Sequence, residues 1–354
     1  MKTACYQIGN SSIASNAFIR SLNLKPIITP KLNNEMVKQG LILSPEFACF
    51  PFKTLLGKLI EALKKGAKLI FIPTPQKISA CQSADFGSAQ QFILKKYGHK
   101  FNIIPINNLN PRNLFNEIKK YNKSITFKQL TNAIILFTQK LYLLEDIQEK
   151  YKLIYLSYNK KKAESFQKKW FLKIEKTDNF LNLRKIKINF NDEFNKLKIK
   201  EINNFIKIGI IGDVYCINEK YLNNNLFERL YNNKIYADNG CKLSMFIIPN
   251  KINKLDYFLN KKTEKYLNHP IGGFSKHSIK QAILYSEKNY DGIIHIYPFG
   301  CMPETVVRTI LPKLSKDYKI PLLHLPIDEQ TGDAGFNTRI EAFIDLIALK
   351  KGDY

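Results

Sequence analysis

The segment Thr54-Leu-Leu-Gly-Lys-Leu-Ile-Glu-Ala-Leu-Lys-Lys-Gly-Ala-Lys-Leu-Ile-Phe-Ile72 joins a helical pattern to a buried strand. Its apolar residues recur at helical spacing, at Leu55, Leu56, Leu59, Ile60 and Leu63. Gly66 is suited to end that helix, because glycine adopts the backbone conformation that a helix C-cap needs. The run from Ala67 to Ile72 is apolar enough to be covered on both faces. A helix that leads into such a strand is typical of a parallel α/β sheet.

The same alternation occurs on both sides of this segment. Before and just after it, the patterns predict strands at Ala4 to Ile8, Lys25 to Thr29 and Phe101 to Ile106, and helices at Ser11 to Leu22 and Gln90 to Lys96. In the last third they predict strands at Phe205 to Ile211, Gly292 to Tyr297 and Leu322 to Leu325, and helices at Glu219 to Tyr231, Lys276 to Asn289, Pro303 to Tyr318 and Thr338 to Lys350. The sequence therefore predicts an α/β protein with two Rossmann-like, doubly wound parallel-sheet lobes, which are candidates for distant structural copies.

The middle of the chain lacks this rhythm. Asn113 to Lys120 and Phe127 to Lys152 have helical patterns, and Lys160 to Lys200 is rich in lysine and asparagine, with scattered aromatics such as Trp170. We interpret this part as a helical insertion that is loosely held in places. The predicted domains are an N-terminal α/β lobe over residues 1–110, the insertion over residues 111–205, and a C-terminal α/β lobe over residues 206–354.

The chain is strongly basic. Its 55 Lys and Arg residues against 30 Asp and Glu residues give a formal net charge of +25, which raises the question of nucleic acid or a membrane surface as partner. The excess is mostly lysine spread along the chain, so we favour a solvated lysine-rich surface over a nucleic-acid interface. The start has no signal-peptide pattern, and no apolar stretch reaches about 18 residues. We therefore expect a cytoplasmic protein without a membrane span.

Three cysteines precede predicted helices. Cys49 lies in Pro45-Glu-Phe-Ala-Cys-Phe-Pro51, Cys81 follows the Ala67 to Ile72 strand, and Cys301 lies in Gly300-Cys-Met-Pro303. Loops that follow strands of an open α/β sheet share one edge, so residues distant in sequence meet there. A single cysteine is more often a buried apolar residue. Three in matching loops, in a reducing cytoplasm, indicate iron–sulfur ligands rather than a disulfide.

Other candidate features have plainer interpretations. Cys5, Cys216 and Cys241 are assigned to core or incidental positions, although any of them is able to supply a fourth ligand. His295 and His324 lie in strand patterns and are interpreted as core histidines. The Gly272-Gly-Phe-Ser-Lys segment is interpreted as an N-capping turn at Ser275 rather than a phosphate site. In the loop that runs into the last helix, two alternatives stay open: Arg339 and Glu341 form an exposed pair, or Asp328, Glu329 and Arg339 line a pocket.

Several of these segments resemble those of proteins related to the 2-hydroxyacyl-CoA dehydratases and their activators, the acyl-CoA dehydratase activase-related group. The matching segments are Leu43 to Lys53, Leu56 to Ala67, Asp291 to Glu304 and Asp328 to Phe343, with Ile8 to Asn10 and Ile208 to Tyr215 in addition. The resemblance implies a [4Fe–4S] cluster held by Cys49, Cys81 and Cys301 and used for low-potential electron transfer. The candidate pocket around it consists of Glu46, Lys53, Glu304, Asp328, Glu329, Thr338 and Arg339.

The chain departs from the family pattern at two places. The segment Ala80-Cys81-Gln-Ser-Ala-Asp-Phe86-Gly87 stands where the family has Gly-Pro-Cys-Arg-Phe-Gly, and Gly272-Gly-Phe-Ser275 replaces a Gly-His-Gly. The chain is therefore identified as a divergent member.

Taken together, the residues and the resemblance predict an iron–sulfur electron-transfer or dehydratase-like component. It would hold its cluster between the lobes and work with an ATP-dependent activator, and a small acyl-CoA-like molecule is the substrate class that the resemblance implies. If the protein is an enzyme, it is a lyase or a low-potential reductase component; an oligomer is left open. The alternative is a non-catalytic binding or scaffold protein with a degenerate cluster site that uses its basic surface on nucleic acid.

Overall fold

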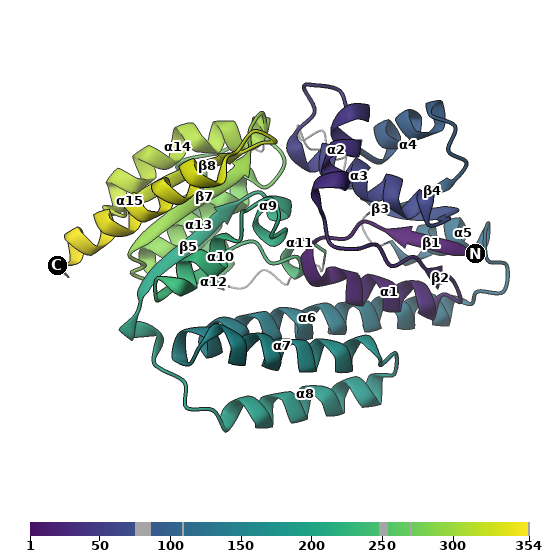
Figure 1. Ribbon diagram of the computed structural model, residues 1–354, viewed down its shortest axis with the longest axis horizontal. Coiled ribbons are helices and arrows are strands. Elements are labelled where there is room, and N and C mark those ends of the chain that lie inside the picture. Colours follow the sequence, from purple (N-terminus) through teal and green to yellow (C-terminus); the bar gives the residue numbers. More distant parts are fainter. Residues whose placement is uncertain (75–85, 108–109, 248–253, 270, 353–354) are drawn as a thin grey trace.

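The computed structural model describes residues 1–74, 86–107, 110–247, 254–269 and 271–352. The chain forms two lobes that stand side by side above a layer of long helices (Figure 1). Each lobe is built on a four-stranded sheet in which every strand pair is parallel. The prediction of an α/β fold with two parallel-sheet lobes is confirmed.

The N-terminal lobe has the strand order β2-β1-β3-β4. Its strands are β1 (Lys2–Cys5), β2 (Lys25–Pro26), β3 (Leu69–Thr74) and β4 (Asn102–Asn107), and its helices are α1 (Ser12–Ser21), α2 (Asn34–Leu43), α3 (Phe50–Lys64) and α4 (Phe86–Lys96). Strand β3 is the apolar run that the sequence marks, and its residues Leu69 to Ile72 are fully buried between β1 and β4. The predicted helix before it is present but begins earlier, at Phe50.

The C-terminal lobe has the strand order β6-β5-β7-β8. Its strands are β5 (Ile206–Gly212), β6 (Ile235–Asn239), β7 (Gly292–Pro298) and β8 (Leu322–Ile327). Its helices are α9 (Val214–Asn218), α10 (Leu226–Asn232), α11 (Ser244–Ile247), α12 (Lys254–Glu264), α13 (Ser275–Glu287), α14 (Met302–Tyr318) and α15 (Asp333–Lys351). Counted along the chain, both sheets place their strands in the order second, first, third, fourth. The lobes are thus topological copies, and each has a switch point beside its first strand, where ligands collect in such sheets.

The helical middle consists of α5 (Pro111–Lys119), α6 (Phe127–Ser157), α7 (Lys160–Glu175) and α8 (Phe180–Asn195). Helix α6 starts at a capping box formed by Thr126 and Gln129, and it runs beneath both lobes, against α1 on one side and α10 and β6 on the other (Figure 1). Trp170 and Phe190 pack edge to face and are fully buried between α7, α8 and α6. The lysine-rich stretch interpreted as loosely held is therefore a pair of regular helices with an aromatic core.

Two sequence predictions of local structure are wrong. The helix predicted from Glu219 to Tyr231 begins only at Leu226, because Asn224 and Asn225 adopt left-handed backbone angles (φ 46° and 55°) that a helix cannot contain. Ser275 is not the N-cap of α13: the cap is Phe274, and the Ser275 hydroxyl donates to the carbonyl of Gly272 at 2.7 Å. Both errors arise from turns whose backbone angles the apolar pattern does not encode.

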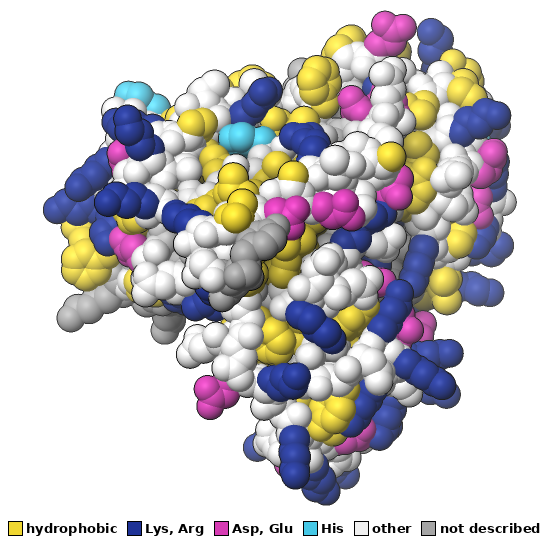
Figure 2. Space-filling view, turned by 60° about the vertical axis from the view of Figure 1, so that its left-hand side comes forward, with side chains coloured by type: hydrophobic (Ala, Val, Ile, Leu, Met, Phe, Trp, Pro, Cys, Tyr) yellow, Lys and Arg dark blue, Asp and Glu magenta, His cyan; other side chains and the backbone are white. Residues whose placement is uncertain are grey.

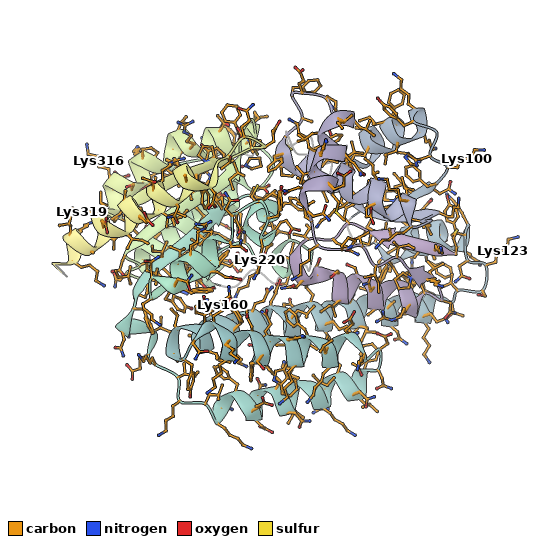
Figure 3. The ribbon with its side chains drawn as sticks, in the orientation of Figure 1. Lys100, Lys123, Lys160, Lys220, Lys316 and Lys319 are labelled. Carbon is orange, nitrogen blue, oxygen red and sulfur yellow. The ribbon has the colours of Figure 1, made fainter. Side chains whose placement is uncertain are left out.

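Positive charge is distributed over the molecule. Lys and Arg side chains occur over all parts of the face seen in Figure 2, and the labelled lysines of Figure 3 extend from elements of both lobes and of the helical layer. Many of these lysines are paired with carboxylates, as are Lys120 with Glu117 and Lys169 with Glu193. No described helix combines the length and the apolar character that a membrane crossing needs.

Candidate functional site

The two lobes meet where the start of α3 faces α9 and the loops of the C-terminal lobe (Figure 1). Three pairs join the two sides: the Lys53 and Glu329 side chains at 2.5 Å, the Lys58 and Glu219 side chains at 2.7 Å, and the hydroxyls of Thr54 and Tyr215 at 3.5 Å. All three residues of α3 in these pairs are buried. The junction is therefore a polar but closely packed surface.

Cys49 is the N-cap of α3 and lies at this junction, half-buried. Its carbonyl accepts the amide N–H of Phe52 at 2.9 Å, and Pro51 occupies the first turn, where the lack of an N–H costs nothing. The position of the helix is fixed by α2, because two glycines let the backbones touch. A Cβ on Gly57 would lie 1.9 Å from the Met36 carbonyl oxygen, and one on Gly40 would lie 1.9 Å from that of Lys53.

Cys301 caps a helix of the other lobe. It is the N-cap of α14, half-buried, with Pro303 in the first turn. Gly300 before it has a φ of +78°, which permits the sharp turn between β7 and the helix. Both cysteines thus cap helices in a Cys-x-Pro sequence, and the positive end of a helix dipole favours the thiolate form of a cysteine.

Cys216 on α9 is one of the three cysteines that the sequence assigns to core or incidental positions, and its side chain is fully buried. Burial raises the pKa of its thiol well above the usual value, and the Asp213 carboxyl and the charges of Cys301 and Cys49 raise the same pKa further. The Cys216 thiol is therefore within electrostatic reach of both helix-capping cysteines. Its place just after β5, at the same edge as the loop after β7, is the sequence signal that could have revealed this.

The remaining predicted ligand, Cys81, lies outside the described residues. Within the described part of the chain, no three Cys, His, Asp or Glu side chains are already arranged to hold a metal ion. The described chain also contains Cys5 and Cys241: burial raises the pKa of Cys5 to about 12, and the Cys241 thiol donates to the Gly212 carbonyl at 3.3 Å.

A buried polar network lies behind Cys301. The Glu304 side chain, only 1% exposed, accepts from the Ser278 hydroxyl at 3.1 Å and lies 2.8 Å from Nε2 of His295. The Nδ1 atoms of His295 and His324 are 3.0 Å apart, so the N–H of one ring donates a hydrogen bond to the nitrogen of the other. Burial lowers the pKa of His324 to about 4. The network therefore holds a carboxyl group and two imidazoles at the base of the cysteine loop.

The other predicted pocket residues divide into two groups. Lys53 and Glu329 form the ion pair across the junction, while Glu46 is exposed between α2 and α3. Asp328 stabilises its own turn, since its carboxylate accepts from the amide of Gln330 at 3.0 Å. Thr338 is exposed on α15, and its hydroxyl donates to the Ala334 carbonyl of the same helix at 3.0 Å.

Arg339 and Glu341 have other partners than each other. Its guanidinium donates to the carbonyl oxygen of His324 and so ties α15 to β8. The Glu341 carboxylate accepts instead from the side-chain amide of Asn337 at 2.6 Å. Of the candidate pocket residues, the structure thus brings Lys53 and Glu329 together and places Glu304 beneath the Cys301 loop.

The two parallel sheets and the helix-capping cysteines at their junction define the class: a two-lobed α/β protein with a cysteine-bearing interface. Residues 8–237, well over half of the chain, match the family model described as CoA enzyme activase uncharacterised domain (DUF2229). The chain belongs to this family. The match contains Cys49, Cys81 and Cys216, whereas Cys301 lies beyond it. A comparison with curated proteins gave no match.

Proposed function

We propose that the protein is an iron–sulfur component of an acyl-CoA dehydratase type of system, acting in electron transfer or in a dehydratase-like reaction. A [4Fe–4S] cluster at the lobe junction would be held by Cys49, Cys81 and Cys301. An ATP-dependent activator would be its partner. Membership of the CoA enzyme activase family supports the relation to that system.

One observation carries this proposal: Cys49 and Cys301 cap two helices of different lobes in the same Cys-x-Pro sequence, where each lies half-buried. The donor set fits the group, because thiolates are the ligands of iron–sulfur clusters and a helix N-terminus favours the thiolate. Such a cluster supplies a low-potential electron when bound. The residues of the chain bind it, orient it and shield it from water.

Cys216 is the candidate for a fourth ligand. The charges of Cys49 and Cys301 both raise the pKa of its thiol, which would have to lose its proton to bind iron. If Cys216 does not bind, three thiolates leave one iron open to substrate.

The test is iron and sulfide per chain after anaerobic purification and reconstitution, together with the visible absorption of thiolate-bound iron. Cys49→Ser and Cys301→Ser should each lose most of the iron, because a serine hydroxyl stays protonated where a thiol ionises. Cys241→Ser is the matched control: the hydroxyl can still donate to the Gly212 carbonyl, so iron should stay near the wild-type value. Circular dichroism checks the fold of each variant.

Two outcomes contradict the proposal. Iron contents that are equal in the wild type and in both junction variants would show that these cysteines are not ligands. A wild-type protein that takes up no iron in reconstitution would favour the binding or scaffold alternative.

A further inference from the structure

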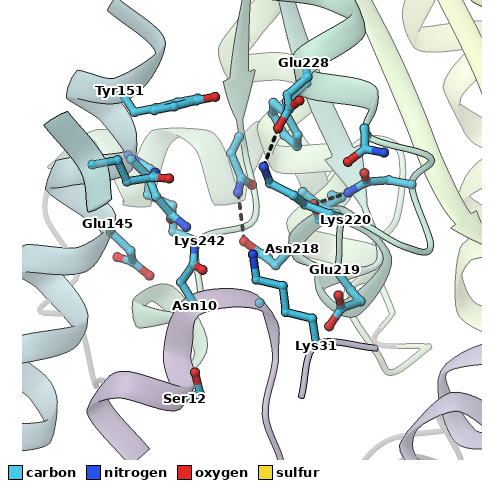
Figure 4. A pocket seen from close by; sticks show the side chains of 18 of the residues that line it. Asn10, Ser12, Lys31, Glu145, Tyr151, Asn218, Glu219, Lys220, Glu228 and Lys242 are labelled. Atoms are coloured by element: carbon cyan, nitrogen blue, oxygen red, sulfur yellow. Dashed lines mark hydrogen bonds and ion pairs between the residues drawn. The ribbon is translucent and has the colours of Figure 1, made fainter. Parts of the chain in front are cut away.

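A second candidate site lies apart from the cysteines, where three parts of the chain meet. A cavity of about 210 Å³ is enclosed by the turn between β1 and α1, by the middle of α6, and by the segments that follow β5 and β6 (Figure 4). Lys58 of α3 also lines it. Both lobes and the helical layer therefore contribute walls, so the cavity exists only in the assembled fold.

The start of α1 forms one wall. Gly9 has a φ of +52°, and a Cβ there would lie 2.5 Å from the Asn218 carbonyl oxygen, so only glycine allows the turn to approach α9 this closely. Asn10 and Ser12 line the cavity beside it. The N-cap of α1, Ser11, makes no side-chain capping bond to the helix, and the first turn contains no acidic residue. Amide groups at such a helix start attract an anion.

The charges around the cavity also favour an anion. Each of its four glutamates is already satisfied by other residues of the protein. The bonds are Glu145 with Ser244, Glu149 with Lys152 and Lys242, Glu219 with Lys58, and Glu228 with Lys160 and Lys220. None of those bonds involves Lys31, whose amine points into the pocket toward Asn218 (Figure 4).

The opposite wall contains a buried polar atom that nothing in the described chain satisfies. The Tyr151 side chain is 6% exposed, and its hydroxyl has no hydrogen-bond partner. It extends from α6 across the pocket toward the side that carries Glu228 (Figure 4). Buried tyrosine hydroxyls usually have a partner, and an unpaired one indicates a bound group. The rings of Tyr151 and Tyr231 pack edge to face at 6.4 Å beside it.

We propose that this cavity binds a small organic phosphate monoester. The phosphate lies at the start of α1 beside Lys31, and the organic part extends toward the hydroxyl of Tyr151. A phosphate fits better than a carboxylate because its three free oxygens can accept from several donors at once, here the side chains of Asn10, Ser12 and Lys31. This proposal is independent of the cysteine site, since neither Lys31 nor Tyr151 belongs to it.

The experiment is isothermal titration calorimetry of the full chain with AMP, glycerol 3-phosphate and inorganic phosphate, and with adenosine and glycerol as the matched compounds without phosphate. At least one ester should bind saturably and more tightly than its unphosphorylated partner. Lys31→Gln should weaken that binding about tenfold, and Tyr151→Phe about fivefold, as expected for a lost charged and a lost neutral hydrogen bond. Lys123→Gln, an exposed lysine of the far surface, should leave it unchanged (Figure 3).

Two results would contradict this proposal. Absence of saturable binding by both esters would overturn the proposal, and so would binding that all three variants weaken equally, because that would reflect the general positive charge. Iron content in Lys31→Gln should equal that of the wild type, so a failure here is distinguishable from a failure of the cluster proposal.

Discussion

Lys58 of α3 and Glu219, the residue after α9, form an ion pair of 2.7 Å across the junction of the lobes. Their side chains are only 10% and 8% exposed, and the Lys58 amine also donates to the Gln7 carbonyl at 3.0 Å. The pair connects α3, the segment after β1 and the end of α9, and both side chains line the pocket of Figure 4. The ion pair therefore links elements of both lobes at their contact.

Removal of one partner of this pair should destabilise the protein strongly. Lys58→Met leaves the Glu219 carboxylate buried without its cation, and we expect the free energy of unfolding to fall by about 3–5 kcal/mol. The double variant Lys58→Met with Glu219→Gln should recover much of that loss, since no buried charge remains. Denaturant unfolding measures both. The control is Lys120→Met, which breaks an exposed pair and should lower the free energy of unfolding by less than about 1 kcal/mol. An equal loss in Lys58→Met and Lys120→Met would contradict the prediction.

Gly57→Ala should separate α2 from α3. The added methyl group would overlap the Met36 carbonyl oxygen, so the helices must move apart, at a cost of about 2–3 kcal/mol. Cys49 begins α3, and iron uptake should therefore fall together with stability. The control is Gly335→Ala in α15, where an added Cβ meets nothing within 4 Å and the better helix propensity should stabilise slightly. A Gly57→Ala protein as stable as the wild type would show that the two helices are not in tight contact.

The His324 side chain should make stability fall in acid. Burial and the charges of His295, Arg308 and Arg339 lower its pKa from 6.5 to about 4, so the unfolded chain binds a proton between these values and the folded chain does not. The contribution of His324 to the free energy of unfolding is complete above pH 6.5 and is lost as the pH falls toward 4. The loss is at most about 1.4 kcal/mol per pH unit. The free energy of unfolding of His324→Asn, which can keep the hydrogen bond to His295, should fall less steeply with decreasing pH. Urea unfolding between pH 4 and pH 6.5 measures this dependence, and an identical dependence in both proteins would contradict the role of His324.

Nucleic-acid binding should be weak and sensitive to salt. The lysines are spread over both lobes and the helical layer, so affinity would rest on counterion release without a defined binding groove (Figure 3). Fluorescence anisotropy with labelled single-stranded RNA and DNA should show binding at low ionic strength that is lost near about 0.2 M salt. A tight complex that persists at that salt would instead support the nucleic-acid alternative.

The sequence by itself determined the two α/β lobes. Leu69 to Ile72 in β3 is a continuous apolar run, and β7 contributes the buried Ile293, Ile294 and Ile296 around His295. A parallel strand that is buried on both faces requires such apolar residues. The helices after Cys49 and Cys301 were also predictable, since proline in a first turn and a preceding cap act within a few residues. These signals depend only on neighbouring residues, so they can be recognised in the sequence without knowledge of the fold.

Only the tertiary structure placed Cys216 where Cys49 and Cys301 raise the pKa of its thiol, closed α2 on α3 through Gly40 and Gly57, and formed the pocket that Tyr151 lines. Lys58 and Glu219 are separated by 161 positions, and no local sequence pattern indicates that they form a pair. Apolar periodicity specifies which face of an element is buried, but not which distant element covers it. That choice depends on the strand order and on how the two lobes and α6 pack, which is a property of the whole chain.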